Sequence, residues 1–312
     1  MSQPSNPLHD YSDLGERAKL NEPLARYTVA RLGGPADALI SADSAAMLDE
    51  IAQLAWDHGW PTRIIGGGAN VLISDQGYRG LVIVNNAKAI DIGADGTVTA
   101  ESGAVLTHLA RQSMAQGLAG FEWAVSVPGT LGGAIVNNAG AHGGDMAASL
   151  ASAEIAFPQH IVETWPLSKL DYHYRESALK RRQDPFVVLG GTLRLASGHD
   201  PAELQTRADG FVAHRKQTQP PGASLGSMFK NPPNDYAGRL IEAAGLKGSR
   251  AGGVMISPIH ANFFVNTGSG TASDYLTLIK LARETVYETF GVTLALEVEL
   301  IGEGFEAIDS RP

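Results

Sequence analysis

Two glycine-rich stretches are the first features of this 312-residue sequence that could do chemistry. In the first, residues 64–72 (IIGGGANVL), an apolar strand runs into three glycines and an asparagine. Glycine lacks a Cβ atom, so successive backbone N–H groups can turn towards one anion and form a nest for a pyrophosphate. The stretch does not match G-x-G-x-x-G, and residues 71–73 are not a helix start, which argues against a Rossmann site. A glycine-rich turn at a strand end is the plain alternative.

The second stretch, residues 127–144 (VPGTLGGAIVNNAGAHGG), supplies small residues, backbone donors and side-chain amides with almost no charge. This composition suits a flat, polar ligand lying against backbone, such as an isoalloxazine ring and its diphosphate. Tight β-turns or a short β-helical corner are the alternative. The stretch has too few charges or periodic positions to predict a helix. The two stretches together favour a ligand site more strongly than either does alone.

Three shorter patterns carry polar side chains. Arg175 stands among aromatics in YHYRES (172–177), where it could bind a carboxylate bidentately or stack on a ring; a surface salt bridge is the alternative. In GSMFKNP (226–232), Ser227 offers a hydroxyl, Lys230 a charge for a phosphate, and Asn231 both a donor and an acceptor. That loop is not a G-x-S-x-G elbow, so no hydrolase nucleophile is indicated, and an ordinary polar loop is the alternative.

A carboxylate pair lies near the end of the chain. Residues 292–301 alternate so that apolar side chains share one face and Glu297 and Glu299 share the other, which predicts a strand. Carboxylates on such a face usually point to water, and periodicity does not say which of the two is special.

The elements that must position these groups are predicted by hydrophobic periodicity. A strand at 36–40, a helix through 47–55 and strands at 63–65 and 81–84 make a β-α-β-β lobe. A helix through 106–110 and strands at 155–157, 161–165 and 186–195 make a mainly β section. Helices through 204–212, 237–244 and 275–286 and strands at 260–266 and 292–301 predict a separate α+β lobe. Residues 1–25 are expected to be a loose leader.

Bulk composition narrows the function further. The net charge of −9 argues against nucleic acid or an anionic membrane as a partner. The absence of cysteine excludes disulfides, thiolate metal sites and cysteine nucleophiles, and it fits a reducing compartment. No signal peptide, membrane span or metal-ligand spacing is legible. We expect a cytoplasmic protein that binds a small molecule, has no metal and is a monomer.

In this order, the motifs resemble those of the UDP-N-acetylenolpyruvoylglucosamine reductase family, from about Thr28 to Gly302. The resemblance also rests on RLGGPA (31–36), AGRLIEAAGLKG (237–248), HANFFVN (260–266) and LEVELIG (296–302). It implies an α+β fold: a vanillyl-alcohol-oxidase-type FAD-binding domain of two subdomains, at 26–86 and 87–198, then a substrate-binding domain at 199–312. About fifty residues separate Arg175 from Ser227, so the chain resembles the shorter form of the family, which lacks a loop with a substrate-capping tyrosine.

The resemblance implies an NADPH-dependent reduction in peptidoglycan precursor synthesis. NADPH would reduce non-covalently bound FAD, and the flavin would give hydride to C3 of the enolpyruvyl ether of UDP-N-acetylglucosamine, yielding UDP-N-acetylmuramate. Ser227 would protonate C2, while Arg175 and Glu297 would stabilise the enolate. The family motif selects Glu297 over Glu299. Tyr174, Lys230 and Asn231 would bind substrate. The implied FAD-binding residues are Gly66, Gly67, Gly68, Ala69, Asn70, Val71, Leu72, Pro128, Gly129, Thr130, Gly132, Gly133, Ala134, Asn137, Ala139 and Gly140.

Three positions depart from the family pattern. Ala69 stands where serine is frequent, His142 where tyrosine is common, and Ile259 where lysine is frequent. These differences bear on affinity rather than on the reaction. Two other functions stay open: an oxidase of the same fold, in which His142 could link the flavin covalently, and a sugar-nucleotide-binding regulator that has lost catalysis.

Overall fold

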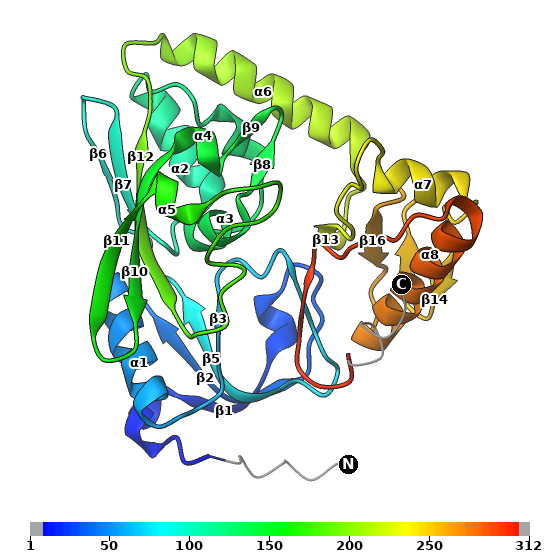
Figure 1. The fold of residues 1–312 in the computed structure, drawn as a ribbon, viewed down its shortest axis with the longest axis horizontal. Coiled ribbons are helices and arrows are strands. Elements are labelled where there is room, and N and C mark those ends of the chain that lie inside the picture. The colour runs from blue at the N-terminus through cyan, green and yellow to red at the C-terminus, as the bar shows by residue number, and fades with distance from the viewer. Residues whose placement is uncertain (1–8, 306–312) are drawn as a thin grey trace.

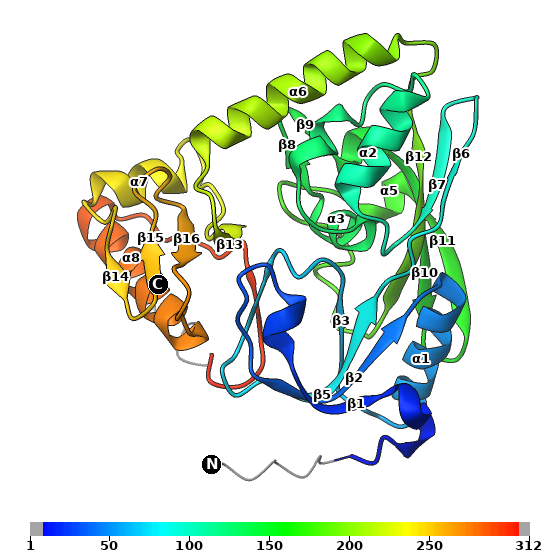
Figure 2. The same cartoon turned by 180° about the vertical axis from the view of Figure 1, so that it is seen from behind.

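The structure is a computed structural model, and it describes residues 9–305. Three sheets in chain order form three lobes (Figure 1). The first two lobes pack against each other, and the C-terminal lobe lies to one side of them. From behind, helix α6 (Pro201–Thr218) is seen to run from the second lobe to the C-terminal lobe (Figure 2).

The first lobe is a four-stranded sheet in the order β1-β2-β5-β3. Its strands are β1 (Lys19–Pro23), β2 (Pro35–Ala42), β3 (Thr62–Ile65) and β5 (Tyr78–Asn85), and helix α1 (Ala45–Asp57) follows β2. Strands β2, β5 and β3 are parallel, and β1 pairs antiparallel with β2. The Ser44 hydroxyl caps α1 by accepting the Met47 N–H, and Leu48 and Ile51 bury the inner helix face. The predicted β-α-β-β order is confirmed.

The second lobe is an antiparallel sheet in the order β11-β10-β12-β7-β6. Its strands are β6 (Ile90–Ile92), β7 (Thr97–Glu101), β10 (Leu150–Phe157), β11 (Ile161–Pro166) and β12 (Val187–Arg194). The shorter elements are α2 (Leu106–Ala115), η3 (Glu122–Ser126), α3 (Leu131–Asn137), β8 (Gly140–Ala141), β9 (Gly144–Asp145), α4 (Met146–Ser149) and α5 (Leu167–Leu170). One apolar core joins the sheet to α2, α3 and the first turns of α6.

The C-terminal lobe is an antiparallel sheet in the order β13-β16-β15-β14, packed against two helices. It contains β13 (Ala223–Ser227), α7 (Ala237–Ala243), β14 (Arg250–Ala251), β15 (Val254–Ile256), β16 (Phe263–Asn266) and α8 (Ala272–Phe290). A capping box of Thr271 and Asp274 begins α8, and Gly291, at φ 67°, ends it.

The last described strand returns to the first lobe. Strand β17 (Glu299–Ile301) pairs parallel with β4 (Val71–Ile73), which begins directly after Asn70, within the first glycine stretch. This pairing fixes the C-terminal segment beside residues 66–70, so motifs more than 200 positions apart in the sequence meet in space.

The structure differs from the sequence expectations at four places. Residues 131–137 form a helix, because the small residues of this stretch allow a short helix that ends at left-handed Asn138. Residues 292–298 are not a strand; regular pairing begins only at Glu299, with one isolated bridge at Leu296. The strand predicted at 260–266 begins at Phe263. Of the expected leader, residues 1–8 lie outside the described part. Residues 9–25, by contrast, include η1 (Ser12–Arg17), β1 and part of η2 (Leu24–Tyr27).

Candidate active site

The two glycine stretches meet face to face. A Cβ atom added at Gly66 would lie 2.2 Å from the Thr130 hydroxyl oxygen, and one added at Gly67 would lie 3.0 Å from the Gly129 Cα. Gly68, at φ 58°, lies against the Tyr27 carbonyl, and its own carbonyl accepts the Val29 N–H. These contacts leave no room for side chains between the stretches. The two separate motifs therefore lie in contact and form one shared backbone surface.

This backbone has the properties that an FAD site needs. A Cβ atom at Gly133, in the first turn of α3, would meet nothing within 4 Å, and Gly129, at φ 114°, is nearly as open. Neither residues 66–72 nor residues 128–140 contain a charged side chain, so no carboxylate would oppose a pyrophosphate. Leu72 and Ala134 are buried in the apolar cores, so their side chains support the loop from behind. The residues of the two glycine stretches therefore fit FAD.

Arg175 lies in a tight turn at the edge of this loop. Its backbone is left-handed, at φ 56°, and the turn is closed by mutual N–H···O bonds of 3.1 Å between His173 and Glu176. Left-handed backbone is costly for a residue other than glycine and persists where the surroundings impose it. The guanidinium donates to the carbonyl oxygens of Gly140, at 2.7 Å, and Asn138, at 3.4 Å. The second glycine stretch therefore orients Arg175.

The third contact of Arg175 is an ion pair with Glu297: Nε donates to Oε1 at 2.8 Å. The Glu297 side chain is 16% exposed, whereas that of Glu299 is 53% exposed and lies 3.5 Å from Arg63. Burial raises the pKa of the Glu297 carboxyl, and the charges of Arg175, Lys180 and Lys230 act in the opposite direction. The two carboxylates that periodicity could not separate thus differ clearly in environment.

Backbone hydrogen bonds join the GSMFKNP segment to the segment that holds Glu297. The Glu297 N–H donates to the Met228 carbonyl at 2.9 Å, and the Lys230 N–H donates to the Ala295 carbonyl at 2.8 Å. Ser227 is the last residue of β13 and pairs with Phe263. The Asn70 amide donates to the Glu297 carbonyl at 3.1 Å. Ser227 and Glu297 therefore lie on adjacent backbone segments, next to the first glycine stretch.

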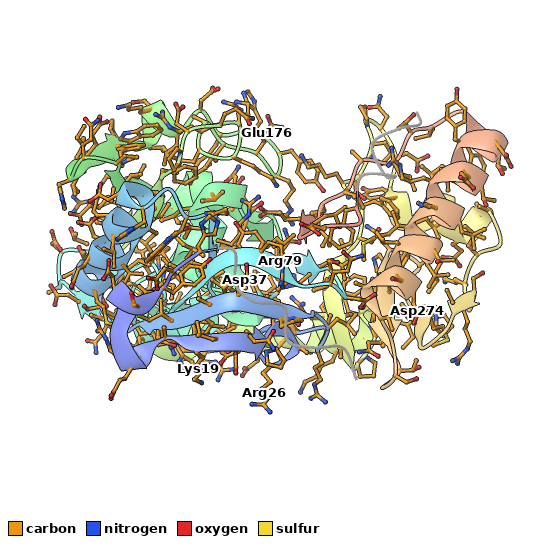
Figure 3. The ribbon with its side chains drawn as sticks, turned by 90° about the horizontal axis from the view of Figure 1, so that it is seen from below. Lys19, Arg26, Asp37, Arg79, Glu176 and Asp274 are labelled. Carbon is orange, nitrogen blue, oxygen red and sulfur yellow. The ribbon has the colours of Figure 1, made fainter. Side chains whose placement is uncertain are left out.

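Lys230 reaches across to the Arg175 turn. Its ammonium lies 3.9 Å from a carboxylate oxygen of Glu176, so the C-terminal lobe contacts the second lobe through opposite charges. Figure 3 shows Glu176 on the side of the second lobe that faces the C-terminal lobe. The structure thus brings together Arg175, Glu297, Lys230 and the segment containing Ser227.

Two other predicted substrate contacts have local partners. Tyr174 is 54% exposed, and the Arg175 guanidinium carbon lies 5.6 Å from the centre of its ring. The Asn231 side-chain oxygen accepts the N–H of Ala237, the first residue of α7, at 3.1 Å. Asn231 therefore fixes the start of that helix.

The structure also shows the contacts or exposure of the three residues that depart from the family pattern, His142, Ile259 and Ala69. The His142 ring stacks on Phe211 of α6 at 4.4 Å between ring centres, and its Nε2 lies 3.1 Å from the Ser126 hydroxyl. Burial lowers the pKa of His142. Ile259 is 51% exposed, and the Ala69 Cβ lies 4.0 Å from where a Cβ atom added at Gly129 would stand. His142 therefore packs the second glycine stretch, to which it belongs, against α6.

Sequence reasoning missed two residues of this site. The Asn138 side chain donates to the His173 carbonyl at 3.0 Å and accepts the Ala147 N–H at 3.1 Å, so it fixes the Arg175 turn to the second glycine stretch. Lys180 donates to the Asn137 side chain at 2.6 Å. Asn138 lies inside the second glycine stretch, whereas Lys180 follows residues 172–177 (YHYRES) with no pattern to mark it.

Two kinds of feature are absent from residues 9–305. In this range, no three His, Asp or Glu side chains are grouped so that they could hold a metal ion. No helix in the same range is long and apolar enough to cross a membrane.

Comparison with known proteins gives consistent matches. Residues 36–162 match the family described as "FAD binding domain", and residues 217–301 match "UDP-N-acetylenolpyruvoylglucosamine reductase, C-terminal domain". The proteins named UDP-N-acetylenolpyruvoylglucosamine reductase from Chloroflexus aggregans and Rubrobacter xylanophilus are each 45% identical. The first alignment covers 90% of this chain and 96% of its relative, and the second covers 92% and 96%.

A solved structure extends the likeness to three dimensions. UDP-N-acetylenolpyruvylglucosamine reductase from Thermus caldophilus superposes with a TM-score of 0.76 at 33% identity. The match covers 91% of this chain and 98% of that one. The predicted fold class, an α+β protein with a vanillyl-alcohol-oxidase-type FAD-binding domain and a C-terminal domain, is confirmed.

Proposed function

This chain belongs to the UDP-N-acetylenolpyruvoylglucosamine reductase family and is an FAD-dependent oxidoreductase, and we propose that it uses NADPH to reduce UDP-N-acetyl-3-O-(1-carboxyvinyl)glucosamine to UDP-N-acetylmuramate. The observation that carries the proposal is the half-buried Arg175–Glu297 pair. It lies beside the joined glycine stretches and is hydrogen-bonded through the backbone to the segment that follows Ser227.

Residues 66–72, together with residues from 128 to 140, would hold the FAD, with the pyrophosphate against backbone N–H groups. Bound FAD would supply the hydride chemistry, taking hydride from NADPH and passing it to C3 of the enolpyruvyl double bond. Side chains of the protein would bind the substrate, stabilise the developing charge and transfer the proton. Because the contacts of Gly66 and Gly67 exclude side chains, the loop can lie directly against the cofactor.

Arg175 would stabilise the negative charge that develops on the substrate carboxylate as C3 is attacked. A guanidinium stays charged at any physiological pH, and a fixed cation contributes most where charge appears only in the transition state. Three protein oxygens already orient Arg175, so its reorganisation during the reaction would be small. This fixed geometry is the main physical support for the assignment.

Ser227 would deliver the proton to C2. A serine hydroxyl is a weak acid, so it needs close placement and a strong local field. The buried Glu297 carboxyl, with its raised pKa, holds a proton more readily than an exposed glutamate does and could replenish Ser227 or stabilise the enolate. Lys230, Asn231 and Tyr174 would contact the UDP-sugar.

We keep the domain limits at 26–86, 87–198 and 199–312, and we propose a monomeric cytoplasmic enzyme. The anionic UDP-sugar would be held by local cations such as Lys230, despite the net charge of −9.

The test is steady-state turnover with product identification. NADPH should be consumed only when the enolpyruvyl UDP-sugar is present, and mass spectrometry should find a product heavier by two hydrogen atoms. Consumption of NADPH with oxygen alone, and indifference to the UDP-sugar, would instead support an oxidase. Binding of the UDP-sugar without NADPH consumption would support a non-catalytic binding protein.

A further inference from the structure

Lys180 contacts the Arg175 turn (residues 173–176) and connects it to helix α3. Its ammonium donates to the side-chain oxygen of Asn137, at 2.6 Å, and to the carbonyl oxygen of Arg175, at 3.4 Å. The Asn137 amide in turn donates to the Gly133 carbonyl at 2.9 Å. A continuous series of hydrogen bonds therefore runs from the backbone of Arg175 through Lys180 into α3.

The backbone around Lys180 is fixed to the same helix. The Ser177 hydroxyl donates to the Val136 carbonyl at 2.6 Å and accepts the Lys180 N–H at 3.1 Å. Because Arg175 is held at positive φ, its side chain can reach Glu297 only while this turn keeps its shape. Lys180 contacts the turn at Arg175 itself.

The charge of Lys180 also acts on the site. Among the described residues, its electrostatic partners are Lys230 and the three carboxylates Glu176, Glu297 and Glu299. Burial has the largest influence on the Lys180 ammonium and lowers its pKa. Glu297 in turn interacts with Arg175, Lys180 and Lys230. The same lysine therefore sets both the position of Arg175 and the field at Glu297.

We propose that Lys180 is a positioning residue for the reduction of the enolpyruvyl substrate: its ammonium ties the backbone of Arg175 to α3 and acts as a second cation on Glu297. This role rests on the proposed function. It differs from a purely structural brace, because a brace would affect folding and FAD retention without changing the ionisation of Glu297.

The test compares Lys180→Met, which removes the charge at similar length, with Lys180→Arg, which keeps it. Lys280→Met is the matched control, because Lys280 is exposed on α8 in the C-terminal lobe. The first readout needs neither cofactor nor substrate: carbon NMR titration of the Glu297 carboxyl in the apoprotein, assigned with Glu297→Gln. The pKa of Glu297 should rise in Lys180→Met and keep its wild-type value in Lys180→Arg and Lys280→Met.

The second readout separates the half-reactions. In Lys180→Met, FAD content and flavin reduction by NADPH should stay at wild-type levels. Reoxidation by the enolpyruvyl UDP-sugar should fall roughly tenfold to a hundredfold, the order expected when a catalytic group is displaced by about an ångström. Lys180→Arg should recover only part of that loss. The guanidinium keeps the positive charge, but its planar shape cannot reproduce both hydrogen bonds of the ammonium, to Asn137 and to Arg175. If Lys180→Met does not fold, the slower reoxidation of Lys180→Arg carries the test.

The outcomes are separable. Wild-type protein that NADPH reduces but the UDP-sugar does not reoxidise overturns the proposed function, and the role of Lys180 with it. Active wild type, with unchanged reoxidation in both Lys180 variants, overturns the role of Lys180 alone. An unshifted Glu297 titration in Lys180→Met, or equal loss of FAD content and of both half-reactions, would reduce Lys180 to a structural brace.

Discussion

Gly133→Ala should stabilise the apoprotein and weaken FAD binding. Gly133 lies in helix α3, and an added Cβ atom would meet no atom within 4 Å. Alanine is favoured over glycine inside a helix by about 0.5–1 kcal/mol, so the free energy of unfolding of the apoprotein should rise by that amount. If FAD lies against α3, the same methyl group occupies cofactor space. We expect at least a tenfold loss of FAD affinity, or about 1.4 kcal/mol.

Gly210→Ala provides the control. Gly210 is a helical, exposed residue of α6, where an added Cβ atom also meets nothing within 4 Å. It should give the same stabilisation without a change in FAD affinity. Urea unfolding of the two apoproteins and titration of flavin fluorescence measure both quantities. Unchanged FAD affinity in stabilised Gly133→Ala would refute the placement of FAD against α3.

Further predictions concern the reaction and its pH dependence. Ser227→Ala should keep flavin reduction by NADPH but slow reoxidation by the UDP-sugar roughly a hundredfold or more, measured anaerobically by stopped flow; unchanged reoxidation would remove Ser227 as the proton donor. Arg175→Ala and Glu297→Gln should impair reoxidation more than reduction, whereas equal losses would point to damaged FAD binding. The folded-state pKa of His142 is lowered, so its contribution to stability is complete above the unfolded value of about 6.5 and is lost as pH falls towards the folded value. His142→Phe should therefore lose less stability over that pH window in urea unfolding, and a loss equal to wild type would contradict the shift. Denatured wild type should release its flavin, and retention would support a covalent link through His142.

Much of the fold could be predicted because strong periodicity coincides with good end signals. Helix α8 has buried residues at helical spacing and a terminal glycine, and β2 and β5 are apolar runs. The prediction failed where tertiary contacts override local pattern. Residues 292–298 alternate as a strand should, yet their partner is a short irregular segment around Phe229 rather than a sheet. Helix α3 is only seven residues long and packs against the sheet of the second lobe. It therefore lacks the charges and the repeated apolar spacing by which an amphipathic helix is predicted.

The order of the motifs predicted the residues of the site better than hydrophobic periodicity did. Glu297 and Glu299 have the same spacing and the same predicted face, and only their burial and ion pairs separate them. The meeting of Arg175 with Glu297 across 122 positions depends on the parallel pairing of β4 with β17, which no local pattern announces. Lys180 was missed for the same reason, since its importance lies in contacts with Asn137 and Arg175 rather than in its own neighbours.

A crystal structure with FAD and the enolpyruvyl UDP-sugar bound tests the central claim most directly. We expect the FAD pyrophosphate against residues 66–70 and 129–130, and the enolpyruvyl carboxylate beside Arg175. C2 of the substrate should lie within hydrogen-bond reach of the Ser227 hydroxyl. A substrate bound with its enolpyruvyl group away from Arg175, Ser227 and Glu297, or a flavin bound outside the joined glycine stretches, would contradict this claim.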